Sequence, residues 1–170
     1  FSPGEAEADR RLSLFMQDRV FEYAQARDRM DLEGTSILSP YLRFGMISIQ
    51  KIFGAVQAAL RQATDAPSRS GIETWLNELI WREFYAAILF HFPFVLKTAF
   101  NPSLRSIPWR EALDDLRAWQ QGLTGYPVVD AAMRQLAITG WMHNRARMIT
   151  ASFLTKDLLI NWQSGEDWFM

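Results

Sequence analysis

Cysteine is absent from the 170 residues, and histidine occurs only twice, at His91 and His143. Without cysteine the chain has no disulfides, no thiolate nucleophile and no cysteine-ligated zinc or iron–sulfur site. Two histidines do not make a multi-histidine metal centre, so we predict no metal site. The lack of cysteine also fits a reducing compartment, and we expect a cytoplasmic protein.

A strong charge of one sign is also missing, because 18 Lys and Arg stand against 19 Asp and Glu. Any nucleic-acid site must therefore be a local patch. No secretory signal opens the sequence, and the longest apolar stretch, residues 84–96, is too short for a bilayer, which takes ~20 residues. We expect no membrane partner. The sequence begins without Met and ends on apolar residues, so we interpret it as a piece of a longer protein.

Aromatic residues are abundant: the chain has seven Trp, 12 Phe and 4 Tyr. With 49% hydrophobic and 22% charged residues, the composition is that of a globular protein. A chain of this length forms about one domain with a sizeable core. A core seldom needs so many indoles, so we expect some of them to serve a flat ligand.

Apolar residues recur at helical spacing along most of the chain, and no period-two strand is convincing. Residues 85–90 are open to interpretation as a strand, but their flanks are helical. We predict an all-α fold of about seven helices: residues 5–29, a helix capped by Ser48, residues 72–91 capped by Ser70, residues 108–121, 128–139 and 144–160, and a last element after a turn at 163–165.

The pattern shows no internal domain boundary. Polar residues 64–71 are the best candidate linker, but about eight residues make an ordinary helix–helix connection. We therefore treat residues 1–170 as one domain or part of one.

A cluster of hydroxyls follows Gly34: Thr35, Ser36 and Ser39 occur within five residues. Hydroxyls and free backbone amides at a turn suit phosphate oxygens. The alternative is an ordinary helix cap and turn, for which Ser and Thr are common residues.

A second cluster places Trp75, Glu78 and Arg82 on one helix face, with Trp81 at its edge. A carboxylate between two indoles should have a raised pKa unless Arg82 pairs with it. Aromatic walls with one polar group suit a flat base or ring. The alternative is an i,i+4 ion pair on a solvated face above core tryptophans.

A third cluster places Asn144, Arg147 and Met148 on one helix face. Arg145 and Arg147 suit phosphates or a partner carboxylate. The alternative is a basic helix flank. His143 has no second ligand at metal-binding spacing, so we interpret it as a structural or hydrogen-bonding residue.

Four long motifs resemble the photolyase/cryptochrome family, and specifically its bacterial DNA photolyases for cyclobutane pyrimidine dimers. They are residues 34–42, 75–85, 124–136 and 140–149. The resemblance covers nearly all of the chain. It implies the first portion of the helical FAD-binding domain, without the antenna domain and the C-terminal portion of the flavin domain.

The resemblance also implies roles for single residues. FAD would be held by Tyr23, Thr35, Ser36, Ile37, Leu38, Ser39, Trp75, Asn144 and Arg147. The damaged DNA would be bound by Glu78, Trp81, Arg82, Asn144, Arg145 and Met148. Catalysis would rest on Glu78 and Asn144, with Trp109 and Trp162 as the outer and middle tryptophans of the chain that photoreduces the flavin.

The implied function is light-driven repair of cyclobutane pyrimidine dimers by electron transfer from reduced FAD to a flipped-out dimer, in the intact parent protein. Family members that repair (6-4) photoproducts carry His at the positions of Asn144 and Met148, which favours the dimer class. The alternatives are a cryptochrome-like blue-light receptor and a flavin-free helical binding fragment. The expected partners are damaged DNA and the remainder of the same polypeptide. We expect the faces bearing Glu78 and Asn144 to share a cavity, with residues 35–39 at its rim.

Overall fold

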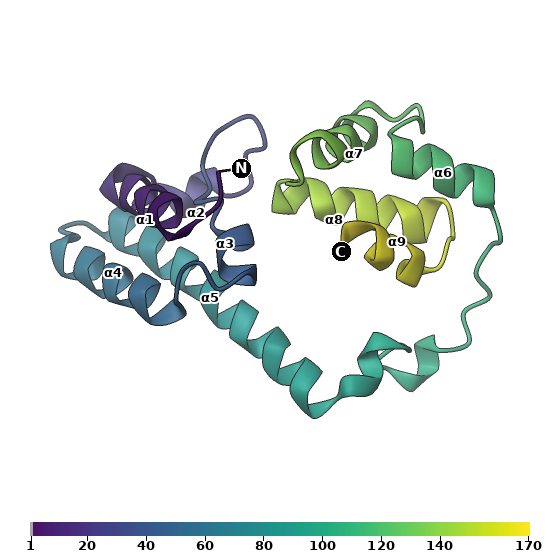
Figure 1. The fold of residues 1–170 in the computed structure, drawn as a ribbon, viewed down its shortest axis with the longest axis horizontal. Coiled ribbons are helices and arrows are strands. Elements are labelled where there is room, and N and C mark those ends of the chain that lie inside the picture. Colours follow the sequence, from purple (N-terminus) through teal and green to yellow (C-terminus); the bar gives the residue numbers. More distant parts are fainter. Residues whose placement is uncertain (1) are drawn as a thin grey trace. The chain divides into compact units, whose positions relative to one another are not determined.

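The computed structural model describes residues 2–170, which form nine α-helices and no β-strand. The predicted all-α fold is therefore confirmed, with two more helices than expected. Contacts divide the chain into two compact units, one ending at Phe100 and one running from Asn101 to Met170. The two units are described separately below (Figure 1).

The first unit is built on one long helix. Its elements are α1 (Glu5–Leu14), the π-helical turn η1 (Phe15–Arg19), α2 (Tyr23–Ala26), α3 (Ser39–Arg43), α4 (Ile49–Gln62), α5 (Ala66–His91) and the 3-10 turn η2 (Pro93–Leu96). Helices α2 and α4 pack against α5, and Figure 1 shows α1 to α4 gathered around its first half. The core between them includes Phe15, Val20, Tyr41, Ile52 and Ile72, all nearly inaccessible to solvent.

Gly71 sets how closely α5 approaches the start of the chain. A Cβ atom at this position would lie 2.3 Å from the carbonyl oxygen of Phe21 and 2.6 Å from that of Val20. These are backbone atoms, which cannot turn away as a flexible side chain can. Only glycine therefore allows α5 to lie directly against this backbone.

The second half of α5 is apolar and exposed. Ile80, Trp81, Tyr85 and Phe90 are each more than half exposed, and Figure 1 shows no other helix of the first unit covering this half. Helices that are apolar on all sides are normally buried inside a larger protein. The first unit thus presents a broad apolar surface along residues 80–100.

The second unit packs around a buried tryptophan. Its elements are the 3-10 turn η3 (Pro102–Leu104), α6 (Leu113–Gln121), α7 (Pro127–Thr139), α8 (Asn144–Ser152), the π-helical turn η4 (Phe153–Asp157) and α9 (Trp162–Phe169). Trp119 is fully buried, and its indole N–H donates to the carbonyl oxygen of Thr150 over 3.0 Å. This bond fastens α6 to α8. Val129, Met133 and Leu154 complete the core.

The turn between α6 and α7 is held by a buried carboxylate. Asp130 accepts hydrogen bonds from the backbone N–H and the hydroxyl of Thr124, over 2.8 and 2.6 Å, and from the N–H of Gly125 over 3.0 Å. Burial by itself would raise the pKa of Asp130, but these hydrogen bonds and the charge of Arg134 outweigh it and lower the pKa.

Two predicted helix boundaries are confirmed. The Ser48 hydroxyl caps α4 by accepting from the N–H of Lys51. Gly140 ends α7 in the left-handed conformation, with a φ of 69°. In both cases the signal lies in one or two neighbouring residues, so the sequence alone was sufficient.

Two predicted helix starts are wrong. Helix α5 begins at Ala66 and not after Ser70, because the Asp65 carboxylate caps it by accepting from the N–H of Ser68 over 2.8 Å. The predicted linker at residues 64–71 is therefore mostly helix. Pro108 does not open a helix either. The N–H of Arg110 donates to the carbonyl oxygen of Leu159, which holds this stretch extended until α6 starts.

Three further elements differ from prediction. The helix expected over residues 5–29 is interrupted by η1, and the one expected over 144–160 changes into η4 and ends by residue 157. The expected turn at 163–165 lies inside α9, where Gly165 is buried against Leu154. Here glycine serves close packing and not a turn. The possible strand at 85–90 is helix.

The close approach at Gly71 predicts opposite effects for one chemical change at two sites. Gly71→Ala should destabilise the chain by more than about 2 kcal/mol, because two backbone oxygens occupy the space. Gly54→Ala in α4 should stabilise it by about 1 kcal/mol, since its Cβ meets no atom within 4 Å and alanine favours the helix. Urea unfolding measures both; equal midpoints for the two variants would contradict the packing described.

The Asp130 turn predicts a pH-dependent stability. Asp130→Asn should destabilise the chain by about 2 kcal/mol, because an amide N–H would replace one acceptor of the buried bonds. The folded-state pKa is lowered, so the advantage of the wild type is complete above about pH 4 and shrinks as pH falls through the folded-state pKa. Urea unfolding at several pH values tests this. Asp114→Asn, at a 98% exposed side chain, should show neither effect.

Candidate functional site

Three aromatic rings form a wall beside α5 in the first unit. Trp75 is 4% exposed and packs on Phe15, with 4.8 Å between ring centroids. Phe15 in turn meets Tyr23 edge-on at 5.9 Å. Glu78 lies one turn further along α5 and pairs with Arg27, which directly follows α2.

Glu78 pairs with an arginine that sequence reasoning missed. The Arg27 guanidinium lies 2.5 Å from the Glu78 carboxylate and also 5.9 Å from the centroid of the Tyr23 ring. The predicted partner, Arg82, pairs instead with its neighbour Glu83. The sequence does show that Arg27 follows Tyr23 by four residues, a spacing that places both side chains on one side of a helical turn. It does not show that Glu78 meets them there.

The electrostatics of this group keep Tyr23 protonated. Burial raises the pKa of Tyr23 to about 12, the charge of Glu78 adds to the rise, and Arg27 opposes it. The phenol is therefore a neutral hydrogen-bond donor at physiological pH. With the Glu78 carboxylate nearby, the aromatic wall is lined by one donor and one acceptor.

Trp81 and Arg82 lie on the exposed part of α5. Trp81 is 53% exposed and stacks on Tyr85, with 5.9 Å between ring centroids. It also meets Phe84 edge-on at 5.4 Å. Trp75 is buried while Trp81 is open, so the two indoles do not enclose Glu78 in an apolar core. Arg82 is exposed and leaves its guanidinium accessible to solvent.

Residues 35–38 form an irregular segment that leads into α3 at Ser39, and the hydroxyls along it are available. Leu38 is buried and anchors the segment, while Ile37 has a φ of +53°. Among residues 2–170, no hydrogen-bond partner is found for the side chains of Thr35, Ser36 or Ser39. The alternative that these hydroxyls cap a helix is therefore wrong, because α3 has no side-chain cap.

Helix α8 carries the predicted residues of the second unit. Asn144 and Met148 are exposed, with 3.9 Å between the amide nitrogen and the sulfur. Arg147 is half-buried, and its guanidinium lies 4.8 Å from the centroid of the Phe169 ring. Burial lowers its pKa. No carboxylate within the described part of the chain pairs with Arg147.

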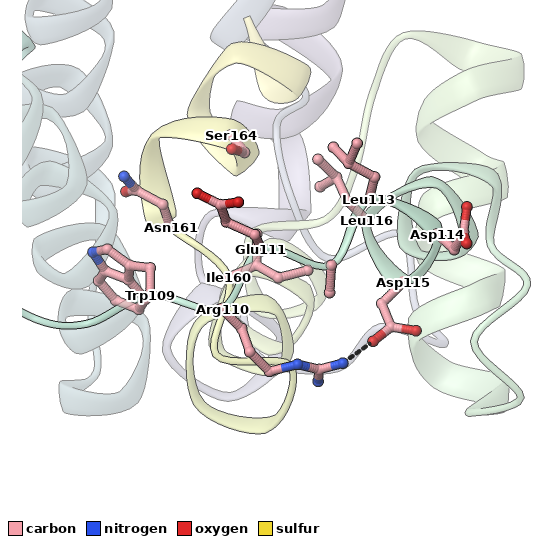
Figure 2. A pocket seen from close by; sticks show the side chains of 11 residues that line it. Trp109, Arg110, Glu111, Leu113, Asp114, Asp115, Leu116, Ile160, Asn161 and Ser164 are labelled. Atoms are coloured by element: carbon pink, nitrogen blue, oxygen red, sulfur yellow. Dashed lines mark hydrogen bonds and ion pairs between the residues drawn. The ribbon is translucent and has the colours of Figure 1, made fainter.

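Trp109 and Trp162 belong to two adjacent segments of the second unit. The bond from the Arg110 N–H to the Leu159 carbonyl is 2.8 Å long and places these segments side by side. Figure 2 shows Trp109 and Asn161 on one wall of an open pocket of about 750 Å³, which also includes Arg110, paired with Asp115. Trp162 follows directly as the first residue of α9.

The predicted site residues thus fall into two groups. Tyr23, residues 35–39, Trp75 and Glu78 lie in the first unit, with Trp81 and Arg82 beyond them. Trp109, Asn144, Arg145, Arg147, Met148 and Trp162 lie in the second. The shared cavity for Glu78 and Asn144 stays a prediction. Across residues 2–170, no three His, Asp or Glu side chains gather as metal ligands.

Comparison with known proteins identifies one family over most of the chain, and it is the family that the sequence motifs resemble. A family model described as the FAD binding domain of DNA photolyase matches residues 75–170. A deoxyribodipyrimidine photo-lyase of Synechococcus sp. is 48% identical over 99% of the chain. The chain belongs to the DNA photolyase family. It spans about a third of the length of the curated relatives it matches, 35% in the case of Synechococcus.

Solved structures of the family show the same fold. A class III photolyase from Agrobacterium tumefaciens superposes with a TM-score of 0.93 at 41% identity, over 99% of this chain and 34% of that protein. A cryptochrome from Synechocystis sp. gives 0.89 at 33% identity, over 99% and 35%. The photolyase fold is thus shown, and it is common to repair enzymes and to a cryptochrome.

The Arg27–Glu78 pair predicts a measurable coupling. Because both side chains are only about 30% exposed, a double-mutant cycle with Arg27→Met and Glu78→Gln should give about 1 kcal/mol of interaction free energy in urea unfolding. The Arg29–Asp31 pair serves as the control. Its side chains are 58% and 62% exposed, so its coupling should be weaker than that of Arg27 and Glu78. Equal couplings for both pairs would contradict the described burial.

Proposed function

We propose that the chain is the first part of the flavin domain of a photolyase that repairs cyclobutane pyrimidine dimers in DNA with light. The observation that carries this proposal is the arrangement on α5. Glu78, paired with Arg27, follows the buried Trp75 by one turn, and the half-exposed ring of Trp81 follows Glu78 by three residues. An accessible aromatic ring beside a polar group suits flat, flipped-out bases. Relatives that match the whole chain are named photo-lyases.

The residues present fit a flavin dinucleotide. Thr35, Ser36 and Ser39 offer hydroxyls that no described residue occupies, and phosphate oxygens are their natural partners. Leu38 is buried and holds that turn, with Ile37 beside it. Tyr23 contributes a neutral donor, and Trp75 an apolar wall. When bound, reduced FAD supplies the light-driven electron that splits the dimer.

The substrate is assigned to the remaining α5 and α8 residues. Glu78, held by Arg27, orients the dimer through a hydrogen bond between its carboxyl group and a thymine base. The exposed ring of Trp81 packs against the flipped base. Arg82 and Arg145 bind the DNA phosphates. Asn144 and Met148 are in contact on the exposed face of α8, and we assign Asn144 a place between flavin and dimer and Met148 a place close to the dimer.

The remainder of the polypeptide is part of the proposed site. The half-buried guanidinium of Arg147 packs on Phe169 without a carboxylate from residues 2–170, and we assign it a carboxylate partner outside them, beside the flavin. The same remainder covers the apolar half of α5. Trp109 and Trp162 are the outer and middle tryptophans of the photoreduction chain. We expect residues 1–170 alone not to repair DNA.

A cryptochrome-like receptor is the second candidate, because the Synechocystis cryptochrome has the same fold. It would bind the same flavin but not repair DNA. Asn144 and Met148, in place of the two histidines of (6-4) enzymes, favour dimer repair.

No helix among the described residues is long and apolar enough to cross a bilayer. We include a cytoplasmic location in the proposal, where DNA and a reducing environment meet.

Flavin binding and repair test the proposal in turn. The purified chain is incubated with FAD, gel-filtered and examined for a co-eluting visible absorption band. Retained flavin supports the assigned half-site, while its loss in this chain but not in the full-length protein shows that the remainder is required. If the full-length protein also retains no flavin, the result supports the alternative of a flavin-free helical binding fragment.

In the full-length protein, Glu78→Gln should lower the yield of dimer repair under blue light by roughly tenfold, because a charge-assisted hydrogen bond is worth ~1.5 kcal/mol. Flavin content should stay unchanged. Glu73→Gln, on the same helix and exposed but outside the proposed site, is the matched control. Flavin binding without any light-dependent repair would favour the cryptochrome-like receptor.

A further inference from the structure

The N-terminus of α8 is capped by a histidine. The imidazole Nδ1 of His143 accepts the backbone N–H of Arg145 over 3.1 Å, and the His143 carbonyl accepts that of Arg147 over 2.9 Å. The backbone of His143 is extended, as it is at ordinary caps. The side chain thus satisfies one of the four N–H groups that a helix start leaves open, while the carbonyl accepts the first regular bond of α8. Ser, Thr, Asp and Asn are the usual residues for this task.

The cap is fixed to the core of the second unit. His143 is 5% exposed, and the Trp141 ring meets it edge-on at 6.2 Å between centroids. The neighbouring Met142 is buried, and its sulfur accepts the hydroxyl of Thr150 in the middle of α8. The imidazole therefore fixes the direction in which α8 leaves the core.

The hydrogen bond also determines where the imidazole carries its proton. A nitrogen that accepts an N–H must itself be unprotonated, so the neutral ring holds its proton on Nε2. The doubly protonated ring would direct an N–H at the N–H of Arg145. It would also place a positive charge at the positive end of the helix dipole.

We propose that His143 is a positioning residue of the photolyase site: its neutral imidazole, protonated on Nε2, caps α8 and fixes Asn144, Arg145 and Arg147 in place. Its side chain contacts neither flavin nor DNA in this role. It acts through the first turn of α8, which carries those three residues. The positioning role rests on the proposed function, whereas the tautomer and the cap do not.

The tautomer is measured by two-bond ¹H–¹⁵N correlation spectra of the ¹⁵N-histidine-labelled chain at neutral pH. Because the chain has only two histidines, the variant His91→Gln leaves the signals of His143 alone. The expected pattern is an unprotonated Nδ1 and a protonated Nε2. A proton on Nδ1, or a doubly protonated ring, would overturn the proposal.

Asparagine and leucine provide a matched pair at position 143, since they are nearly equal in shape and only asparagine can accept the bond. The Arg145 amide hydrogen should exchange roughly fivefold faster in the His143→Leu variant than in the His143→Asn variant, as expected for a lost cap. Flavin affinity should fall by a similar factor in the leucine variant and recover in the asparagine variant. Equal exchange in both variants would refute the cap.

The two levels of the proposal fail separately. If no form of the protein retains flavin, the proposed function fails, and the spectra and the exchange rates still decide the cap. If exchange differs as expected while flavin affinity is equal in both variants, the cap holds and the positioning role is refuted. If the leucine variant does not fold, the wild-type spectra still test the tautomer. The positioning role is then tested by flavin binding of the asparagine variant, which should recover.

Discussion

The contact between α5 and the backbone of residues 20–21 is the constraint on which the first unit depends. Gly71 allows two backbones to meet where any side chain would collide. This approach brings Trp75 onto Phe15 one turn further along, and Glu78 to Arg27 in the next. The aromatic wall and the charged group at its edge are therefore consequences of one close contact. Their spacing along α5 follows from the helix period.

The second unit is organised by its helix ends. Asp130 gathers three hydrogen bonds in the turn before α7, Gly140 ends that helix, and His143 begins the next within three residues. These hydrogen bonds tie backbone N–H groups at the helix ends to buried side chains, which fixes the directions of α7 and α8. Asn144 and Met148 on α8 are themselves exposed, so they add little to stability.

The two units differ in how complete they are. The second has a closed core around Trp119, whereas α5 of the first presents apolar side chains over residues 80–100. Such a surface belongs inside a larger protein, which agrees with relatives about three times as long. In the second unit the half-buried Arg147 guanidinium lies over the Phe169 ring.

The sequence by itself determined the helical class, the caps at Ser48 and Gly140, and the family, because periodicity, local caps and long motifs are written in neighbouring residues. It misplaced the starts of α5 and α6, where Asp65 and the Arg110–Leu159 bond decide. The pairing of Arg27 with Glu78 and the contact of Arg147 with Phe169 were decided only by tertiary structure. These partners are 51 and 22 residues apart, and no local pattern encodes which distant side chain a packed helix brings within reach.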